Sequence, residues 1–125
     1  MVSTSTDRQA GSAGLGWKAP VNAATTANLT LSAEQTVDGV ALVDGNRVLV
    51  KDQSTAAENG IYIVRTGAWD RAPDWDGAGD VVTGTLVFVI PGGSTNAKRV
   101  YYVSTTGTIT VGTTSVAFTL GTTLS

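Results

Sequence analysis

The chain has 125 residues, a net charge of −2 and charged side chains at 14% of its positions. This length suits a single domain, and the shortage of charge leaves much of the surface to neutral Thr, Ser, Gly and Ala. Neither histidine nor cysteine occurs, so the commonest general base, the commonest metal ligand and all thiolate chemistry are excluded. Because Lys and Arg are scattered along the chain, we expect no nucleic-acid binding through phosphate contacts.

Residues 1–16 are mainly Ser, Thr, Gly and Ala around a single Asp–Arg pair. Such a segment has almost nothing apolar to bury and is not expected to fold alone. We therefore expect an extended arm, held by a neighbouring subunit or another partner through Val2, Arg8, Leu15 and Trp17. Trp17 could anchor the arm to its own domain or to a neighbour. The arm lacks the features of a signal peptide, and the longest apolar run, residues 86–90, is too short to cross a bilayer, so no membrane partner is expected.

Beyond the arm, short apolar runs recur at spacings near ten residues and are separated by Gly, Asn or Asp turns. This pattern predicts strands and very little helix. The expected strands are residues 29–31, 40–43, 47–51, 61–64, 85–90, 98–104, 108–111 and 115–120. Residues 32–38 are expected as a turn or a single helical turn, and Asp44-Gly45 predicts a hairpin between 40–43 and 47–51. Val48 and Val50 flank Leu49, which indicates a strand buried on both faces. The expected fold is all-β: one small antiparallel sandwich or barrel over residues 17–125, preceded by the arm.

Acidic side chains cluster in residues 70–80, at Asp70, Asp74, Asp76 and Asp80. Paired carboxylates can hydrolyse glycosides or bind Ca²⁺. The spacing here does not match an EF-hand calcium loop. A glycosidase is not favoured either, because all four carboxylates come from one short segment instead of from distant strands. Capping of turns and pairing with nearby arginines is the simpler interpretation. We predict no catalytic residue, no metal site and no cofactor, and hence no enzyme.

Trp69 and Trp75 lie in the same irregular segment. Exposed indoles in a loop can stack on sugars, which makes these two residues candidate glycan-binding positions. In a small β domain with few aromatic residues, indoles are more useful in the core, with Arg71 lying over one of them. We favour the core role.

Charged residues border the strand that is expected to be buried on both faces, and a buried charge without a partner is costly. The sequence therefore predicts a structural brace made of Arg47, Lys51, Asp52, Arg71 and Asp74. We expect at least one ion pair or bond to the backbone to tie the Lys51–Asp52 end of the strand to residues 70–76.

Several ordered blocks resemble a module that is common in bacteriophage tail-fibre and related virion proteins. The blocks are KAPV at 18–21, ATTANLTLS at 24–32, QTVDGV at 35–40, NRVLVKDQ at 46–53, NGIY at 59–62 and GAWDRA at 67–72. The resemblance extends from residue 18 to at least residue 120. It departs from the usual pattern at Asn46, where the module more often has Asp.

The resemblance implies a non-enzymatic structural protein of the virion, assembled in the host cytoplasm, with no catalytic residues to carry over. A chain of this length fits a short tail-fibre-like appendage or an adaptor, and a capsid decoration (cement) protein is the alternative. The implied partners are other virion proteins of the tail or capsid, in a symmetric homo-oligomer. A module that binds host surface glycans through Trp69 and Trp75 is a further alternative, and an enzyme acting on cell-wall glycan would need two facing carboxylates.

Overall fold

A computed structural model describes residues 16–77 and 79–125. The fold is nearly all β, in agreement with the expected fold class. Within these residues, the helical elements are two short 3₁₀ helices, η2 (Ala56–Glu58) and η3 (Pro73–Trp75). Of the expected arm, only residue 16 belongs to the described part of the chain.

In the described part of the chain, the strands form two main sheets and one small hairpin. The antiparallel three-stranded sheet has the order β10-β9-β8, made of β8 (Leu86–Phe88), β9 (Arg99–Val103) and β10 (Phe118–Thr123). The four-stranded sheet has the order β2-β5-β6-β7, made of β2 (Ala23–Ala24), β5 (Arg47–Val50), β6 (Gly60–Ile63) and β7 (Asp70–Arg71). In it β2 runs parallel to β5, and the other pairs are antiparallel. The hairpin consists of β3 (Thr36–Val37) and β4 (Val40–Ala41).

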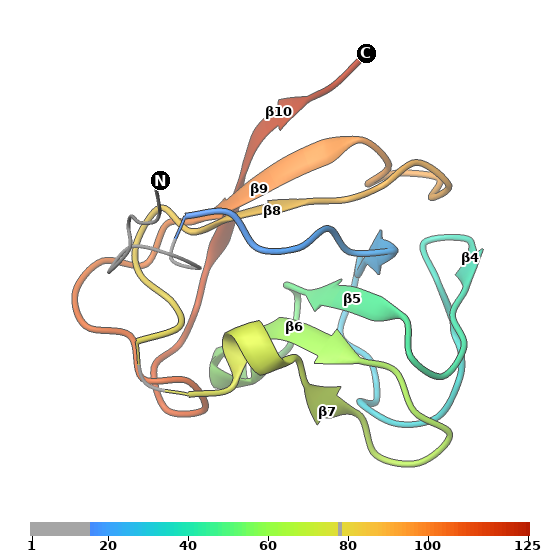
Figure 1. Ribbon diagram of the computed structural model, residues 1–125, viewed down its shortest axis with the longest axis horizontal. Helices are drawn as coiled ribbons and strands as arrows, with labels where there is room; N and C mark the ends of the chain where they lie inside the picture. The colour runs from blue at the N-terminus through green and yellow to red at the C-terminus, as the bar shows by residue number, and fades with distance from the viewer. Residues whose placement is uncertain (1–15, 78) are drawn as a thin grey trace, which may run out of the picture.

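Residues 16–25 connect the two main sheets. The backbone N–H groups of Lys18 and Val21 donate to carbonyls of β8, at 2.9 and 3.0 Å. A few residues later, the N–H groups of Asn22 and Thr25 donate to carbonyls of β5, at 2.8 and 2.9 Å. In Figure 1 this blue segment lies between β8 above and β5 below. Two isolated parallel bridges, at Trp17 and Val21, mark its pairing with the β8 region.

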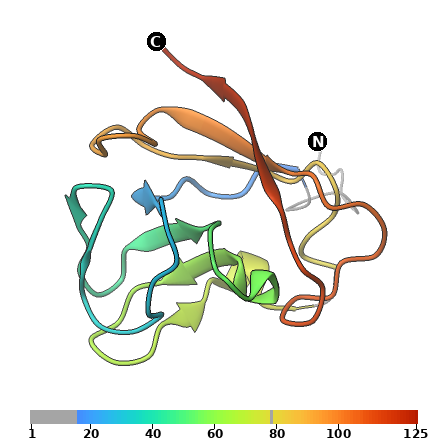
Figure 2. The same cartoon turned by 180° about the vertical axis from the view of Figure 1, so that it is seen from behind.

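The main core fills the space between the two sheets. Its buried members are Val21, Ala24, Leu49, Ile61, Ala72, Trp75, Val81, Val87, Val89, Tyr101, Val103, Ile109 and Val116. The view from behind shows the segment that ends in β10 rising from the level of the four-stranded sheet past the three-stranded one (Figure 2). The resulting architecture is sandwich-like.

A second core lies on the opposite face of the four-stranded sheet, under residues 29–42. It contains Ala23, Val37, Leu42, Val48, Val50, Tyr62, Val64 and Trp69. Because Leu49 faces the first core while Val48 and Val50 face the second, β5 is buried on both faces, as its sequence predicts.

The predicted hairpin across Asp44-Gly45 is wrong. Strand β4 pairs with β3 across Asp38-Gly39, whereas β5 pairs with β6. Asp38 and Gly39 have φ values of 50° and 82°, which are the two positive values that a type I′ hairpin turn requires. Residues 44–46 still form a turn, in which the Asn46 N–H donates to the Val43 carbonyl at 3.0 Å.

Two further predicted strands are absent and one is displaced. Residues 29–31 are held by side chains instead of a strand: the Leu29 N–H donates to Gln53 Oε1 at 3.0 Å. Residues 108–111 belong to a loop, where the Thr113 and Thr114 N–H groups both donate to the Thr110 carbonyl. The last strand begins at Phe118, three residues later than expected.

The Asp38 carboxylate secures the β3–β4 hairpin to the loop before β9. It accepts the Thr95 N–H at 3.0 Å and the Asn96 N–H at 2.7 Å. Replacing Asp38 by Asn keeps a residue that tolerates positive φ but removes the charge, so we expect the free energy of unfolding to fall by about 1 kcal/mol. Urea denaturation measures it. Asp44→Asn, in the other Asp-Gly turn, is the control and should stay within about 0.5 kcal/mol of the parent; equal losses would contradict this role of Asp38.

Candidate functional site

The strongest ion pair of the 46–76 block joins β5 to η3. The Arg47 guanidinium meets the Asp74 carboxylate in a bidentate arrangement, with N–O distances of 3.1 and 3.0 Å. The same guanidinium donates to the Ala19 and Pro20 carbonyls at 2.9 and 3.2 Å. Arg47 therefore holds together the connecting segment, the four-stranded sheet and the tryptophan-containing loop, which is a structural role.

Arg71 is used in the same way. It donates to the Ala57 and Asn59 carbonyls at 2.9 and 3.2 Å, and so closes the loop that contains η2. Its guanidinium lies 5.0 Å from the centre of the Tyr62 ring, so it stacks on a tyrosine instead of the expected indole. Burial, with a smaller opposing effect of the Arg71 charge, raises the pKa of the Tyr62 hydroxyl.

The predicted tie between the Lys51–Asp52 end of β5 and residues 70–76 is wrong. Lys51 Nζ instead pairs with the neighbouring Asp52 carboxylate at 3.0 Å, and it lies 5.1 Å from the centre of the Tyr101 ring. Asp52 also accepts the Thr25 hydroxyl at 2.9 Å. Because β5 runs away from η3, only Arg47 at its start is near enough to reach Asp74.

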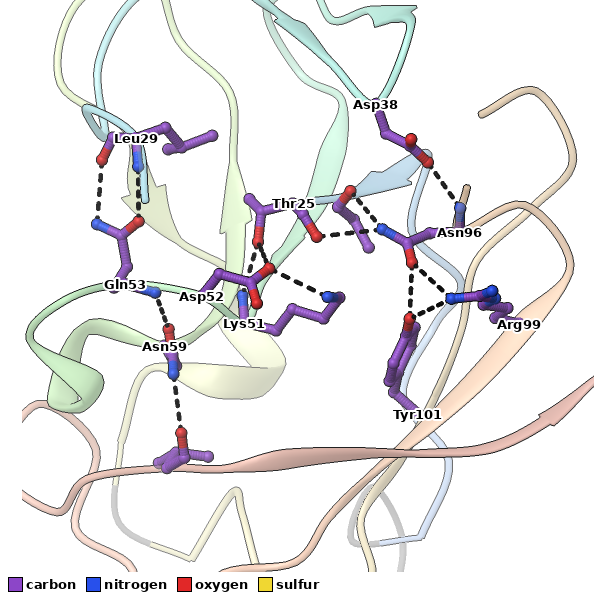
Figure 3. A network of polar contacts seen from close by, with 12 residues as sticks. Thr25, Leu29, Asp38, Lys51, Asp52, Gln53, Asn59, Asn96, Arg99 and Tyr101 are labelled. Carbon is purple, nitrogen blue, oxygen red and sulfur yellow. Dashed lines mark hydrogen bonds and ion pairs between the residues drawn. The ribbon is translucent and has the colours of Figure 1, made fainter. Parts of the chain in front are cut away.

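Lys51 and Asp52 belong to a polar network between the two sheets (Figure 3). At its centre the buried Asn96 amide donates to the Ala24 and Thr25 carbonyls, at 3.0 and 3.1 Å. The Asn96 side-chain oxygen accepts the Tyr101 hydroxyl at 2.6 Å and the Arg99 guanidinium at 3.4 Å. Since each of these groups bonds within the network, it stabilises the stacking of the sheets and offers no free acid or base.

Buried Asn59 makes a second link. It accepts the Gln53 N–H at 3.0 Å and donates to the Val116 carbonyl at 2.8 Å, so it connects the η2 loop to the segment before β10. Sequence analysis missed Asn59, Asn96, Thr25 and Tyr101, whose partners are mostly far away along the chain. The only local signal was the placement of Asn59 directly before Gly60.

Both indoles of the candidate glycan site are buried. Trp69 is 7% exposed and Trp75 is 0% exposed. Trp69 donates its Nε1–H to the Ala33 carbonyl at 2.8 Å, and Trp75 packs on Phe118 with 5.5 Å between ring centres. A side chain at Gly60 would collide with Trp75, since an added Cβ would lie 2.5 Å from Nε1. The candidate role of these two rings in stacking on sugars is therefore wrong, and both indoles belong to the core.

Among the clustered aspartates, the carboxylates of Asp70, Asp74 and Asp80 have separate structural partners. Asp70 pairs with Arg65 at 3.0 Å, and Asp80 accepts the N–H groups of Asp76 and Gly77, each at 3.0 Å. These two backbone hydrogen bonds lower the pKa of the Asp80 carboxyl, and the bond from the Asp76 N–H has the larger effect. In residues 16–77 and 79–125, no group of three or more His, Cys, Asp or Glu side chains is placed to hold a metal ion.

A groove of about 390 Å³ is a concave feature on the described part of the surface. Its lining consists of Asn28, Leu29, Thr30, Leu31, Gln53, Ser54, Thr55 and Glu58. Glu58 is the only carboxylate among them, and its Oε1 accepts the Gln53 amide at 3.0 Å. Two-carboxylate glycoside hydrolysis therefore lacks its second group in this groove.

The backbone at Trp17 is held beside β8, whereas the Trp17 side chain is exposed. The Leu86 N–H donates to the Gly16 carbonyl at 2.8 Å, which holds this position beside β8, while the indole is 58% exposed. The other predicted arm contacts, Val2, Arg8 and Leu15, lie outside the described residues. The described part of the chain contains no helix of the length and hydropathy that a membrane span needs.

Comparison of the chain with protein-family models, with curated proteins and with solved structures gave no match.

The Arg47–Asp74 pair is suited to a double-mutant cycle. With Arg47→Lys, Asp74→Asn and the double variant, we expect a coupling energy of about 1–2 kcal/mol, because the pair is bidentate and both side chains are largely shielded. Denaturant unfolding gives all four free energies. A parallel cycle on Arg65 and Asp70, which are more exposed, should give a clearly smaller coupling energy. Similar couplings in the two cycles would remove the case for Arg47 as the brace.

The lowered pKa of Asp80 predicts a pH effect. Because the folded-state pKa lies below the unfolded one, ionised Asp80 stabilises the fold above the unfolded pKa of about 4, and this contribution is lost as the pH falls through the folded pKa. Asp80→Asn should therefore unfold at a lower temperature than the parent at pH 7, and the difference should shrink as the pH falls below about 4. Thermal melts followed by circular dichroism measure both. Asp44→Asn is again the control, and a constant difference across this range would contradict the mechanism.

Proposed function

We propose that the protein is a non-enzymatic structural module of a bacteriophage virion, a short tail-fibre-like appendage or an adaptor. In this role residues 1–16 are the arm that docks on neighbouring virion subunits. The observation that carries the proposal concerns the blocks that resemble virion modules: their charged residues make contacts within the domain. Their charged side chains Arg47, Lys51, Asp52 and Arg71 all bond inside the domain, as framework and not as a reactive cleft.

The geometry at Trp17 supports an arm that starts at a defined point. The backbone there is bonded to β8, whereas the side chain is 58% exposed and belongs to neither core cluster of the described residues. A large aromatic side chain on a fixed backbone is a typical anchor at a protein interface. Capsid decoration would use the same anchor and differs only in its place on the particle.

The test is a truncation that leaves the sheets intact. Removing residues 1–15 but keeping Gly16 preserves the carbonyl that accepts the Leu86 N–H. We expect the truncated chain to melt within a few degrees of the parent but to be missing from purified phage particles, measured by quantitative mass spectrometry. The control Trp17→Ala keeps the backbone pairing and should reduce incorporation without abolishing it.

Normal incorporation of the truncated chain would rule out docking through the arm. Absence of the full chain from purified particles would rule out the virion role itself. Labelling the full chain and imaging intact particles then separates a position on the tail from a position on the capsid.

A further inference from the structure

The outward face of the three-stranded sheet is apolar, which is unusual for an antiparallel sheet with one solvated face. Side chains alternate along strands, and Val87, Val89, Tyr101 and Val103 point into the main core. Their neighbours therefore point outward, and none of them belongs to either core cluster. With Trp17, which is bridged to Leu86, they form what we call the neutral face: Trp17, Leu86, Phe88, Val100 and Tyr102.

The members of the neutral face lie in register across neighbouring backbone segments. Leu86 pairs with Tyr102, which pairs in turn with Thr119, and Phe88 pairs with Val100. Leu86, Phe88 and Tyr102 are partly exposed, and the Trp17 indole is 58% exposed at the margin. Val100 is 6% exposed and forms the floor of the face between them. Three aromatic side chains on one outer face, with a threonine border, match the composition of protein interfaces.

Charged residues are scarce in residues 81–125, which contain the three-stranded sheet. Lys98 and Arg99 are the only charged residues in residues 81–125, although charged residues make up 14% of the whole chain. Arg99 points inward, where it donates to Asn96 and Tyr101, and Lys98 lies in the turn before β9. The edge strand β10 therefore lacks the charges that ordinarily prevent association at a sheet edge.

We propose that the neutral face packs against the same face of a second copy of this chain. A charged face needs a partner of opposite charge, whereas a face without charge can meet its own copy without repulsion. The net charge of −2 gives little long-range repulsion between copies. This contact differs from the arm and does not depend on a virion role, because it is argued from the sheet alone.

The size of the face predicts a weak contact. Four backbone segments at ~4.8 Å spacing and about five residues at ~3.4 Å each define roughly 300–400 Å². This equals the largest apolar patch of many monomers, but it is about half of what each partner contributes to a stable complex. We therefore expect self-association of the isolated chain in the high-micromolar range, as two sheets stacked face to face.

Sedimentation of the purified full chain at concentrations up to about 1 mM tests the proposal. Leu86→Glu and Thr119→Glu each place a charge on the face, and each should raise the dissociation constant at least about tenfold. Thr119 is exposed, so its variant should fold normally even where Leu86→Glu does not. The matched control is Val43→Glu, which changes a 52% exposed side chain after β4 and should leave association unchanged.

Complementary charges then test whether the two faces meet each other. Thr119→Glu and Thr119→Lys should each associate weakly alone, and a mixture of the two should associate more tightly than either. A chain that is monomeric at every concentration would overturn the proposal and indicate that a different protein covers the face. Equal weakening by Val43→Glu, no effect of either face variant, or no gain on mixing would overturn it as well.

Discussion

The structure depends on one backbone segment that hydrogen-bonds to two sheets in succession. Residues 16–21 pair with β8, and residues 22–25 pair with β5. Both edges would otherwise expose unpaired N–H and C=O groups next to the main core, which is costly. Because Val21 and Ala24 on this segment are also fully buried between the sheets, the segment sets the distance between them as well as their register.

Buried polar side chains then restrict how the sheets can stack. Asn96 bonds to the Ala24 and Thr25 carbonyls from the loop before β9, and Asn59 bonds to the Val116 carbonyl from the loop before β6. Apolar packing alone tolerates small sliding movements, whereas a buried amide that loses its partner costs about 1–3 kcal/mol. These amides therefore favour one arrangement of a core made largely of small aliphatic side chains.

Local pattern was enough to predict the fold class, the burial of β5 on both faces and the pairing of Asp70 with nearby Arg65. It was not enough to choose between two similar turns. Val37-Asp38-Gly39 and Val43-Asp44-Gly45 are identical in sequence, but only the first connects paired strands. The difference arises from Asp38, which caps the distant Thr95 and Asn96 amides, and from β6, which takes the pairing edge of β5. No window of neighbouring residues contains that information.

The same limit explains the misplaced brace. The sequence suggested which charged side chains need partners. It did not show that Lys51 pairs with the adjacent Asp52, or that the direction of β5 brings Arg47 to Asp74. The two carbonyls that accept the Asn96 amide lie 71 and 72 residues away and carry no motif.

The distribution of charge separates framework from surface in this molecule. In the 46–76 block the charges are taken up by contacts that hold the fold, such as Arg47 with Asp74 and Arg71 with the η2 loop. The three-stranded sheet holds almost no charge and presents aromatic side chains outward. A cluster of charged residues and tryptophans in a sequence suggests an active site, and a neutral Thr-rich stretch suggests a segment without a specific role. The contacts reverse both impressions here, because most charges of the block are paired within the domain, whereas the neutral sheet has partly exposed aromatic side chains on its outer face.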